Sequence, residues 1–327
     1  MSAVPTTMSN KHWRLDARYV PLVITISLFV AMATAGSIFY DGFFAPQVFL
    51  NLLIDNAFLC IVAVGMTFVI LTGGIDLSVG SIVAFTTMIS ATLVERHALS
   101  PLVTIPLVLI VGALFGLLHG FLIQRFRLQP FIVTLAGMFL ARGLSYLIST
   151  ESISIENPTY HWIAGMRIPL GSASVSISAI IALIVVISGM WIAHATQFGR
   201  TIYAIGGDEA SARLMGLPVN RTLIGVYVLS GFCSALAGVV MTFYMLSGYS
   251  LHAVGLELDA IAAVVIGGTL LRGGIGYISG TFVGVMILGI IQTLIVFDGT
   301  LSSWWTRIVV GALLLAFCLL QRLLERR

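Results

Sequence analysis

The residues best suited to chemistry lie inside a hydrophobic run. Residues 63–85 read AVGMTFVILTGGIDLSVGSIVAF, a stretch long enough to cross a bilayer that still carries Thr72, Asp76 and Ser78. A carboxylate at membrane depth costs about 2.5–3.5 kcal/mol on insertion scales, so it should face a partner or a wet pathway rather than lipid. Asp76 therefore either lines a pathway for a polar solute or caps backbone groups freed nearby.

Glycines interrupt the same run beside Asp76. Glycine lets the backbone leave a helix, and backbone groups freed at membrane depth must be buried in protein or face a wet cavity. A second string, GGIGYISGTFVG at 273–284, aligns without a gap with GGIDLSVGSIVA at 73–84, although Gly276 replaces the aspartate. The match is either chance among abundant residues or a sign of two related broken segments along one pathway. The expected break glycines are Gly73, Gly74, Gly80, Gly273, Gly274 and Gly280.

Other polar residues within apolar runs are weaker pathway candidates. Asp55 and Asn56 face an outer mouth or hydrogen-bond to neighbouring helices, and Gln292 faces a pathway or another helix. Arg142 lies in mid-run and needs a partner, for which we expect a structural ion pair. Its candidate partners are Asp76, Asp259 and a helix C-terminus. The full set of pathway candidates is Asp76, Ser78, Thr72, Asp55, Asn56, Arg142, Gln292 and Tyr249.

Composition places these residues in a membrane protein. Of the 327 residues, 59% are hydrophobic and 9% are charged, against about 25% charged residues in a soluble domain. This excludes a soluble enzyme, and a net charge of +3 gives no reason to expect a nucleic-acid partner. The three cysteines lie in apolar runs and predict buried free thiols. We find no P-loop, metal-binding or nucleophile motif, so we expect no cofactor and no catalytic site in the chain.

Ten apolar runs approach the roughly 20 residues that cross a bilayer. They are residues 20–39, 48–71, 78–94, 101–124, 131–149, 174–194, 222–247, 257–271, 276–296 and 306–321. The eighth run is short and the third begins inside the interruption, so eight or nine crossings result if these are re-entrant. The expected fold is an all-α polytopic membrane protein of about ten spans with broken or re-entrant segments.

Positive charge gives an orientation for this scheme. We expect cytoplasmic tails at 1–19 and 322–327 around a single transmembrane domain at 20–321, with a cytoplasmic loop at 195–221 and an outer loop at 150–173. Arg96 and Arg167 then lie outside, while Arg142 and Arg307 lie within spans. The inside residues are Lys11, Arg14, Arg18, Arg125, Arg127, Arg200, Arg213, Arg221, Arg272, Arg322, Arg326 and Arg327. Twelve against two satisfies the positive-inside rule.

The inner loop contains signals for one short helix. Asp208 suits an N-cap, Glu209 suits a first turn, and Gly216 with Pro218 suits a C-terminus, which predicts about two turns over 207–216. A helix this short needs a surface to dock on. It is either a coupling helix for a separate motor subunit or a linker packed on its own bundle. The expected coupling residues are Gly207, Asp208, Glu209, Ala212, Arg213 and Gly216.

Several strings resemble a known family. They are AVGMTFVILTGGIDLSVGS, LAGMFLARGLSYL, YAIGGDEASARLMGL, DAIAAVVIGGTLLRGGIGYISGT and FDGTLSSWWTRI. Together they look like carbohydrate ABC-importer permeases of the ribose and galactose type, closest to galactofuranose-importer permease subunits. The resemblance covers nearly the whole chain from about Asn51. It implies a bacterial inner-membrane permease in contact with lipid, an ATPase partner in the cytoplasm, a second permease subunit forming a heterodimer, and a periplasmic sugar-binding protein.

The expected function is therefore ATP-driven sugar import, with ATP hydrolysed by the partner subunit. The main alternative is an ion-coupled secondary sugar transporter in which Asp76 holds the proton or sodium ion. A channel or signalling receptor is a third hypothesis. ATP dependence and the need for a binding protein separate the first hypothesis from the other two.

Overall fold

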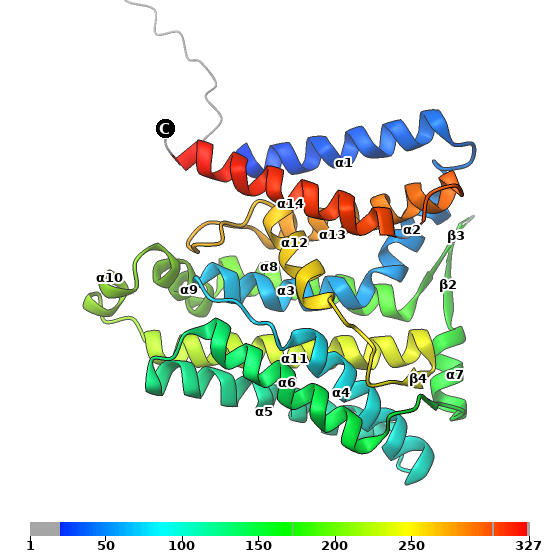
Figure 1. Ribbon diagram of the computed structural model, residues 1–327, viewed down its shortest axis with the longest axis horizontal. Coiled ribbons are helices and arrows are strands. Elements are labelled where there is room, and N and C mark those ends of the chain that lie inside the picture. The colour runs from blue at the N-terminus through cyan, green and yellow to red at the C-terminus, as the bar shows by residue number, and fades with distance from the viewer. Residues whose placement is uncertain (1–19, 172, 303, 326–327) are drawn as a thin grey trace, which may run out of the picture.

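Long apolar helices lie side by side and run between two ends of the molecule (Figure 1). The structure, a computed structural model, describes residues 20–171, 173–302 and 304–325. The helices are α1 Val20–Phe39, α2 Pro46–Asp55, α3 Ala57–Leu71, α4 Val79–Ala91, α5 Pro101–Phe126, α6 Pro130–Ile148, α7 Pro158–Gly165, α8 Ile177–Ala195, α9 Gln197–Gly207, α10 Glu209–Leu214, α11 Val219–Met245, α12 Leu256–Ile266, α13 Ile278–Asp298 and α14 Trp304–Glu325. A π-helical turn, Thr92–Arg96, extends α4.

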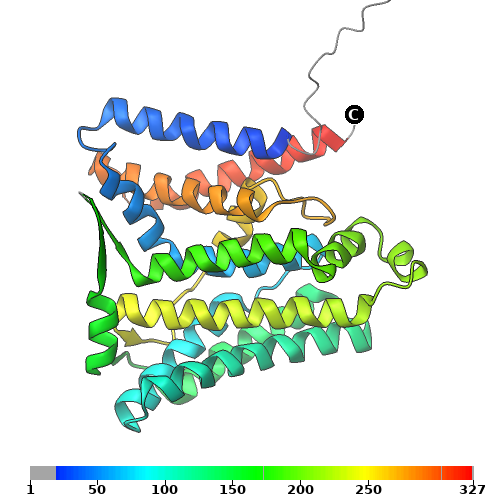
Figure 2. The same cartoon turned by 180° about the vertical axis from the view of Figure 1, so that it is seen from behind.

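The two ends of the bundle differ in structure. One end, which we name the α10 end, holds α9, α10, the turn between α5 and α6, and the connection from α12 to α13 (Figures 1 and 2). The other, the hairpin end, holds α7 and four short strands: β1 Ile153–Ser154, β2 Arg167–Leu170, β3 Ala173–Ser176 and β4 Ser247–Gly248. β2 pairs antiparallel with β3, and β1 pairs antiparallel with β4. The predicted cytoplasmic loop at 195–221 and the predicted outer loop at 150–173 thus lie at opposite ends of the bundle.

The expected count of about ten spans is not supported. Among the described residues, seven helices are long and apolar enough to cross a membrane, or eight if the pair α2 and α3, bent by 59°, is one span. The expected run at 257–271 is helical only as far as Ile266, where the 11-residue α12 ends and the chain leaves the helix. The run at 306–321 lies in α14, whose apolar part, Trp304–Leu319, is shorter than the helices counted above.

The predicted interruptions are confirmed at both strings. α3 ends at Leu71 and α4 begins at Val79, so residues 72–78 leave the helix. Gly73 there has a φ of +79°, which favours glycine. The connection 267–277 separates α12 from α13 in the same way. Gly80 and Gly280, expected within the breaks, instead lie in the first turns of α4 and α13, where other segments come close.

The two breaks touch one another at the α10 end. The Gly274 N–H donates to the Leu71 carbonyl at 3.0 Å. A Cβ atom placed on Gly273 would lie 2.8 Å from the backbone nitrogen of Gly73. Contact between the aligned strings favours their origin as related segments over a chance match.

α3, which precedes the first break, is the central helix of the bundle. Fourteen of its 15 residues are buried, and it packs against α8, α11, α12 and α13. α11 in turn packs closely on α5, because Gly112, Gly116 and Gly120 of α5 face its backbone. Small residues at this spacing are typical of close contacts between membrane helices. The segment carrying the first break is therefore held by protein on its sides rather than by lipid.

The predicted tails lie largely outside the described residues. This applies to the tail at 1–19, with Lys11, Arg14 and Arg18, and to Arg326 and Arg327. The C-terminal tail expected from residue 322 includes the last residues of α14, which continues to Glu325.

Candidate functional site

The Asp76 carboxylate lies at the centre of a buried hydrogen-bond network in the first break. Its Oδ1 accepts hydrogen bonds from the Ser78 backbone N–H at 3.0 Å and the Ser78 hydroxyl at 2.5 Å. Its Oδ2 accepts from the Ser230 hydroxyl of α11 at 2.8 Å. The Ser78 hydroxyl also lies 3.4 Å from Nδ1 of His119 on α5. The carboxylate thus joins the break to α11 and α5.

This arrangement suits a carboxylate that caps freed backbone groups. Asp76 and Ser78 are fully buried, and Ser78 immediately precedes α4. Negative charge is favourable at the start of a helix, where N–H groups lack partners. A role for Asp76 in the pathway stays a prediction, because no part of its side chain is accessible in this conformation.

A cavity of about 650 Å³ opens beside the same break at the α10 end. Thr72, Gly73 and Gly74 form one wall of it. The turn between α5 and α6, with Arg127, and α10, with Glu209, form others. The first break and the predicted coupling helix therefore border the same cavity, which is large enough to hold many water molecules.

A second group of predicted residues meets near the hairpin end. Asp55, Asn56 and Gln292 line one cavity of about 250 Å³ between α2 and α13, although Gln292 is distant from the other two in sequence. Asp55 accepts a hydrogen bond from the Tyr244 hydroxyl at 3.1 Å, and the Asn56 amide donates to the Leu52 carbonyl at 2.9 Å. Asn56 also marks the bend between α2 and α3. The cavity combines a carboxylate, amides and an aromatic side chain, Phe297.

Arg142 does not form the expected ion pair. It donates to the carbonyls of Ser250 and His252 at 2.5 and 2.9 Å, in the connection between β4 and α12. Asp259, one of its expected partners, lies 4.0 Å from Arg307 of α14 instead. No pattern in the sequence indicated that the non-helical connection between β4 and α12 would place backbone carbonyls beside Arg142 of α6.

This connection and the first turn of α12 also hold polar atoms without partners. Ser250 Oγ, His252 Nδ1 and Glu257 Oε2 are buried and have no hydrogen-bond partner among the described residues. The ring of Tyr249, one of the predicted pathway residues, packs edge-on against His252 with ring centroids 5.7 Å apart. Arg142 itself lies six residues before the end of α6, or about 9 Å along the helix. Buried polar atoms without partners are rare in folded proteins, so this region is unusually polar for a membrane helix bundle.

We refer to this region as the polar face; it comprises residues 249–259, Arg142 of α6 and Arg307 of α14. Leu251, Val254 and Leu258 are exposed on it, so it is open at the surface of this chain. Charged groups at such a surface are costly against lipid. Glu257 and Asp259, in the first turn of α12, belong to this face.

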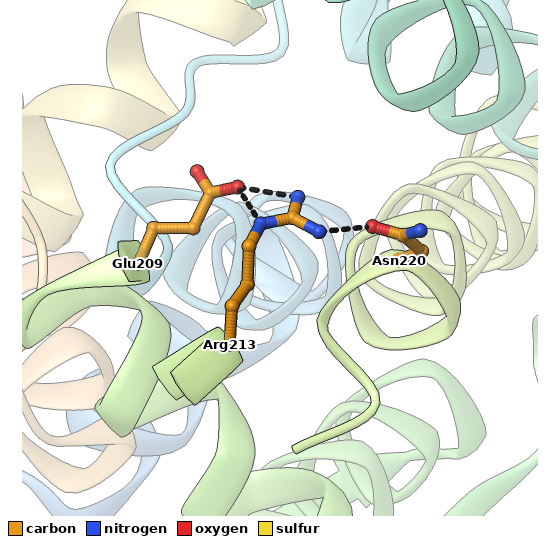
Figure 3. Close-up of polar contacts among 3 residues, drawn as sticks. All are labelled: Glu209, Arg213 and Asn220. Carbon is orange, nitrogen blue, oxygen red and sulfur yellow. Dashed lines mark hydrogen bonds and ion pairs between the residues drawn. The ribbon is translucent and has the colours of Figure 1, made fainter. Parts of the chain in front are cut away.

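α10 has the ends that the sequence predicts, although it is shorter than expected. Asp208 accepts a hydrogen bond from the Ser211 N–H at 2.6 Å, and this bond lowers the pKa of Asp208. Gly216 has a φ of +75° just after the helix. Glu209 and Arg213 pair at 2.6 Å, and Arg213 donates to Asn220 at the start of α11 at 2.7 Å (Figure 3). The helix is therefore fixed to α11.

The two faces of α10 have opposite surroundings. Ala212 is fully buried and packs with Ile205 and Val219. Leu214 and Met215 are 89% and 67% exposed. We name these two residues the α10 tip. The anchored helix therefore presents an apolar pair that is free to contact another protein.

Comparisons with known proteins identify transport permeases as relatives of this chain. Residues 48–318 match the family model described as "Branched-chain amino acid transport system / permease component". The chain is 52% identical to the inner membrane ABC transporter permease protein YjfF of Escherichia coli (strain K12), over 93% of this chain and 92% of that protein. It is 42% identical to the fructose import permease protein FruG of Bifidobacterium longum (strain NCC 2705), over 96% and 94%. It is 37% identical to the ribose import permease protein RbsC of Escherichia coli (strain K12), over 94% and 96%. No solved structure matches the chain significantly.

Proposed function

The chain belongs to the family of transport-system permease components, and we propose that it is the membrane-spanning permease of an ATP-driven, binding-protein-dependent sugar importer. The relatives named for fructose and ribose import support a sugar as the solute. The chain carries no P-loop, so a partner must hydrolyse ATP. The permease itself performs no covalent chemistry.

The observation that carries the proposal is the geometry of α10. Its inner face is anchored on the bundle while the α10 tip projects outward, which suits a helix that receives an ATPase subunit. We therefore place the α10 end in the cytoplasm of a bacterium and the hairpin end at the periplasmic side, where the binding protein docks. Arg125 in the last turn of α5 and Arg127 and Arg272 in connections lie at the α10 end, in agreement with the positive-inside rule.

The polar face is the proposed contact with a second, different permease subunit. Covering this face would remove its charged groups, such as the pair of Arg307 and Asp259, from lipid. Arg142, Tyr249 and Thr72 would then border a path between the two subunits. The cavity with Asp55, Asn56 and Gln292 offers a separate polar surface near the outer entrance.

The ion-coupled alternative depends on Asp76 binding a proton or a sodium ion. In this structure both carboxylate oxygens already accept hydrogen bonds from Ser78 and Ser230. That arrangement favours ATP-driven transport, in which Asp76 needs no ion.

The sugar that we propose is galactofuranose, since the strings GGIDLSVGS and FDGTLSSWW resemble those of galactofuranose permeases most closely. The test is uptake of labelled galactofuranose, ribose, fructose and L-arabinose by cells that express the whole transport system, with and without this chain. We expect chain-dependent uptake of galactofuranose above the other three sugars. Chain-dependent uptake of another sugar instead would reject galactofuranose as the substrate, and uptake of none would reject all four sugars.

A further inference from the structure

We propose that α9 transmits motion from α10 to both helix breaks through a contact of glycine backbones. This inference rests on the proposed function, and it adds the positioning residues through which an ATPase would act on the pathway. We name the contact the glycine junction; it consists of Gly206 on α9, Leu71 and Gly73 at the first break, and Gly273 and Gly274 at the second.

Gly206 packs against backbone atoms of both breaks. A Cβ atom placed on it would overlap the Leu71 carbonyl oxygen and the Gly274 backbone nitrogen, and would lie 2.9 Å from the Gly274 Cα. The first and second breaks are joined at the same point by the hydrogen bond from the Gly274 N–H to the Leu71 carbonyl. Three segments distant in sequence therefore meet with no side chain between them.

A second contact joins α9 to the second break. The Tyr203 hydroxyl donates to the Gly276 carbonyl at 2.9 Å. The Tyr203 ring also stacks on His194 of α8, with centroids 6.2 Å apart. One turn of α9 thus contacts the second break by a hydrogen bond at Tyr203 and by direct backbone packing at Gly206.

The other end of this linkage is α10. Asp208 alone separates Gly207, the last residue of α9, from Glu209, the first residue of α10. Force on the α10 tip reaches α9 through this extended residue and through the packing of Ala212 against Ile205 of α9. Close-packed backbones transmit displacement because they cannot be compressed or rotated aside as a flexible side chain can. A shift of α9 must therefore move both breaks together.

Replacing Gly206 by alanine tests the junction in the complete complex with its ATPase, second permease and binding protein. The added methyl group separates α9 from the breaks, whereas α10 and its tip are unchanged. We expect the complex to assemble and hydrolyse ATP, while sugar imported per ATP hydrolysed falls at least about ten-fold, a size typical of coupling between sites.

Two further variants make the test specific. Gly311→Ala in α14 is the matched control, because a Cβ there meets open space, and we expect an unchanged ratio of sugar to ATP. Tyr203→Phe removes only the hydrogen bond to Gly276 and should lower the ratio by a smaller factor. It decides the question if Gly206→Ala fails to assemble.

If Gly206→Ala imports as much sugar per ATP hydrolysed as the wild type, the inference is overturned. If Gly206→Ala does not assemble, an unchanged ratio of sugar to ATP in Tyr203→Phe overturns it. An equal loss in Gly311→Ala would also overturn it. Failure of the proposed function has a different signature, because the wild-type complex itself would then show no ATP-dependent import.

Discussion

Replacing both residues of the α10 tip by aspartate removes the ATPase subunit from the purified complex and abolishes sugar uptake. Leu214 and Met215 are the exposed apolar side chains of an anchored helix. Burying two such side chains contributes about 3–6 kcal/mol, which corresponds to about 100-fold or more in affinity. Carboxylates at the same positions add a desolvation cost. The measurement is co-purification of the ATPase in mild detergent, together with uptake in cells.

The matched control for this experiment is Leu170→Asp. Leu170 is 55% exposed in β2 at the hairpin end, far from the proposed docking surface. We expect the Leu170→Asp variant to keep the ATPase bound. That result would show that a charge added to an exposed apolar position does not by itself disrupt assembly. An ATPase that stays with the double variant would place the docking site elsewhere.

Replacing Asp76 by alanine destabilises the chain, whereas replacing it by asparagine does not. Alanine leaves the Ser78 N–H and the hydroxyls of Ser78 and Ser230 buried without their acceptor. Each such group costs about 1–3 kcal/mol, against a total stability of about 5–15 kcal/mol for a typical domain. Asparagine keeps one acceptor oxygen for both groups of Ser78, and its amide can donate to Ser230.

Reaction of the buried thiols of Cys60 and Cys233 with a thiol reagent on heating reports this unfolding. We expect exposure of these thiols at a temperature about 5 °C or more lower in Asp76→Ala, with Asp76→Asn close to the wild type. Uptake separates the two roles of the carboxylate. A stable Asp76→Asn that no longer imports sugar would return Asp76 to the pathway, and an Asp76→Ala as stable as the wild type would remove the capping role.

The sequence predicted local features governed by backbone chemistry. Both breaks lie where glycine strings interrupt apolar runs, and Asp208 and Gly216 delimit α10 as expected. These features depend on a few neighbouring residues, so they can be inferred without knowledge of the fold. The same reasoning gave too many spans, because an apolar run at 257–271 does not reveal where its helix ends.

Features that depend on distant segments were missed. The partners of Arg142 are carbonyls of a connection more than 100 residues later, which no local pattern indicates. Gly206 was part of the predicted inner loop, yet its contact with both breaks depends on how α9 folds back on the bundle. The α10 tip was likewise visible only once Ala212 showed which face of the helix is buried.

The most direct test of ATP-driven import uses the complete complex reconstituted in vesicles with the binding protein and labelled sugar. Ionophores remove proton and sodium gradients, and ATP is supplied to the side that carries the ATPase. We predict that sugar accumulates only with ATP and that the ionophores leave the rate unchanged. Accumulation that proceeds without ATP and stops with the ionophores would contradict this account and establish an ion-coupled transporter.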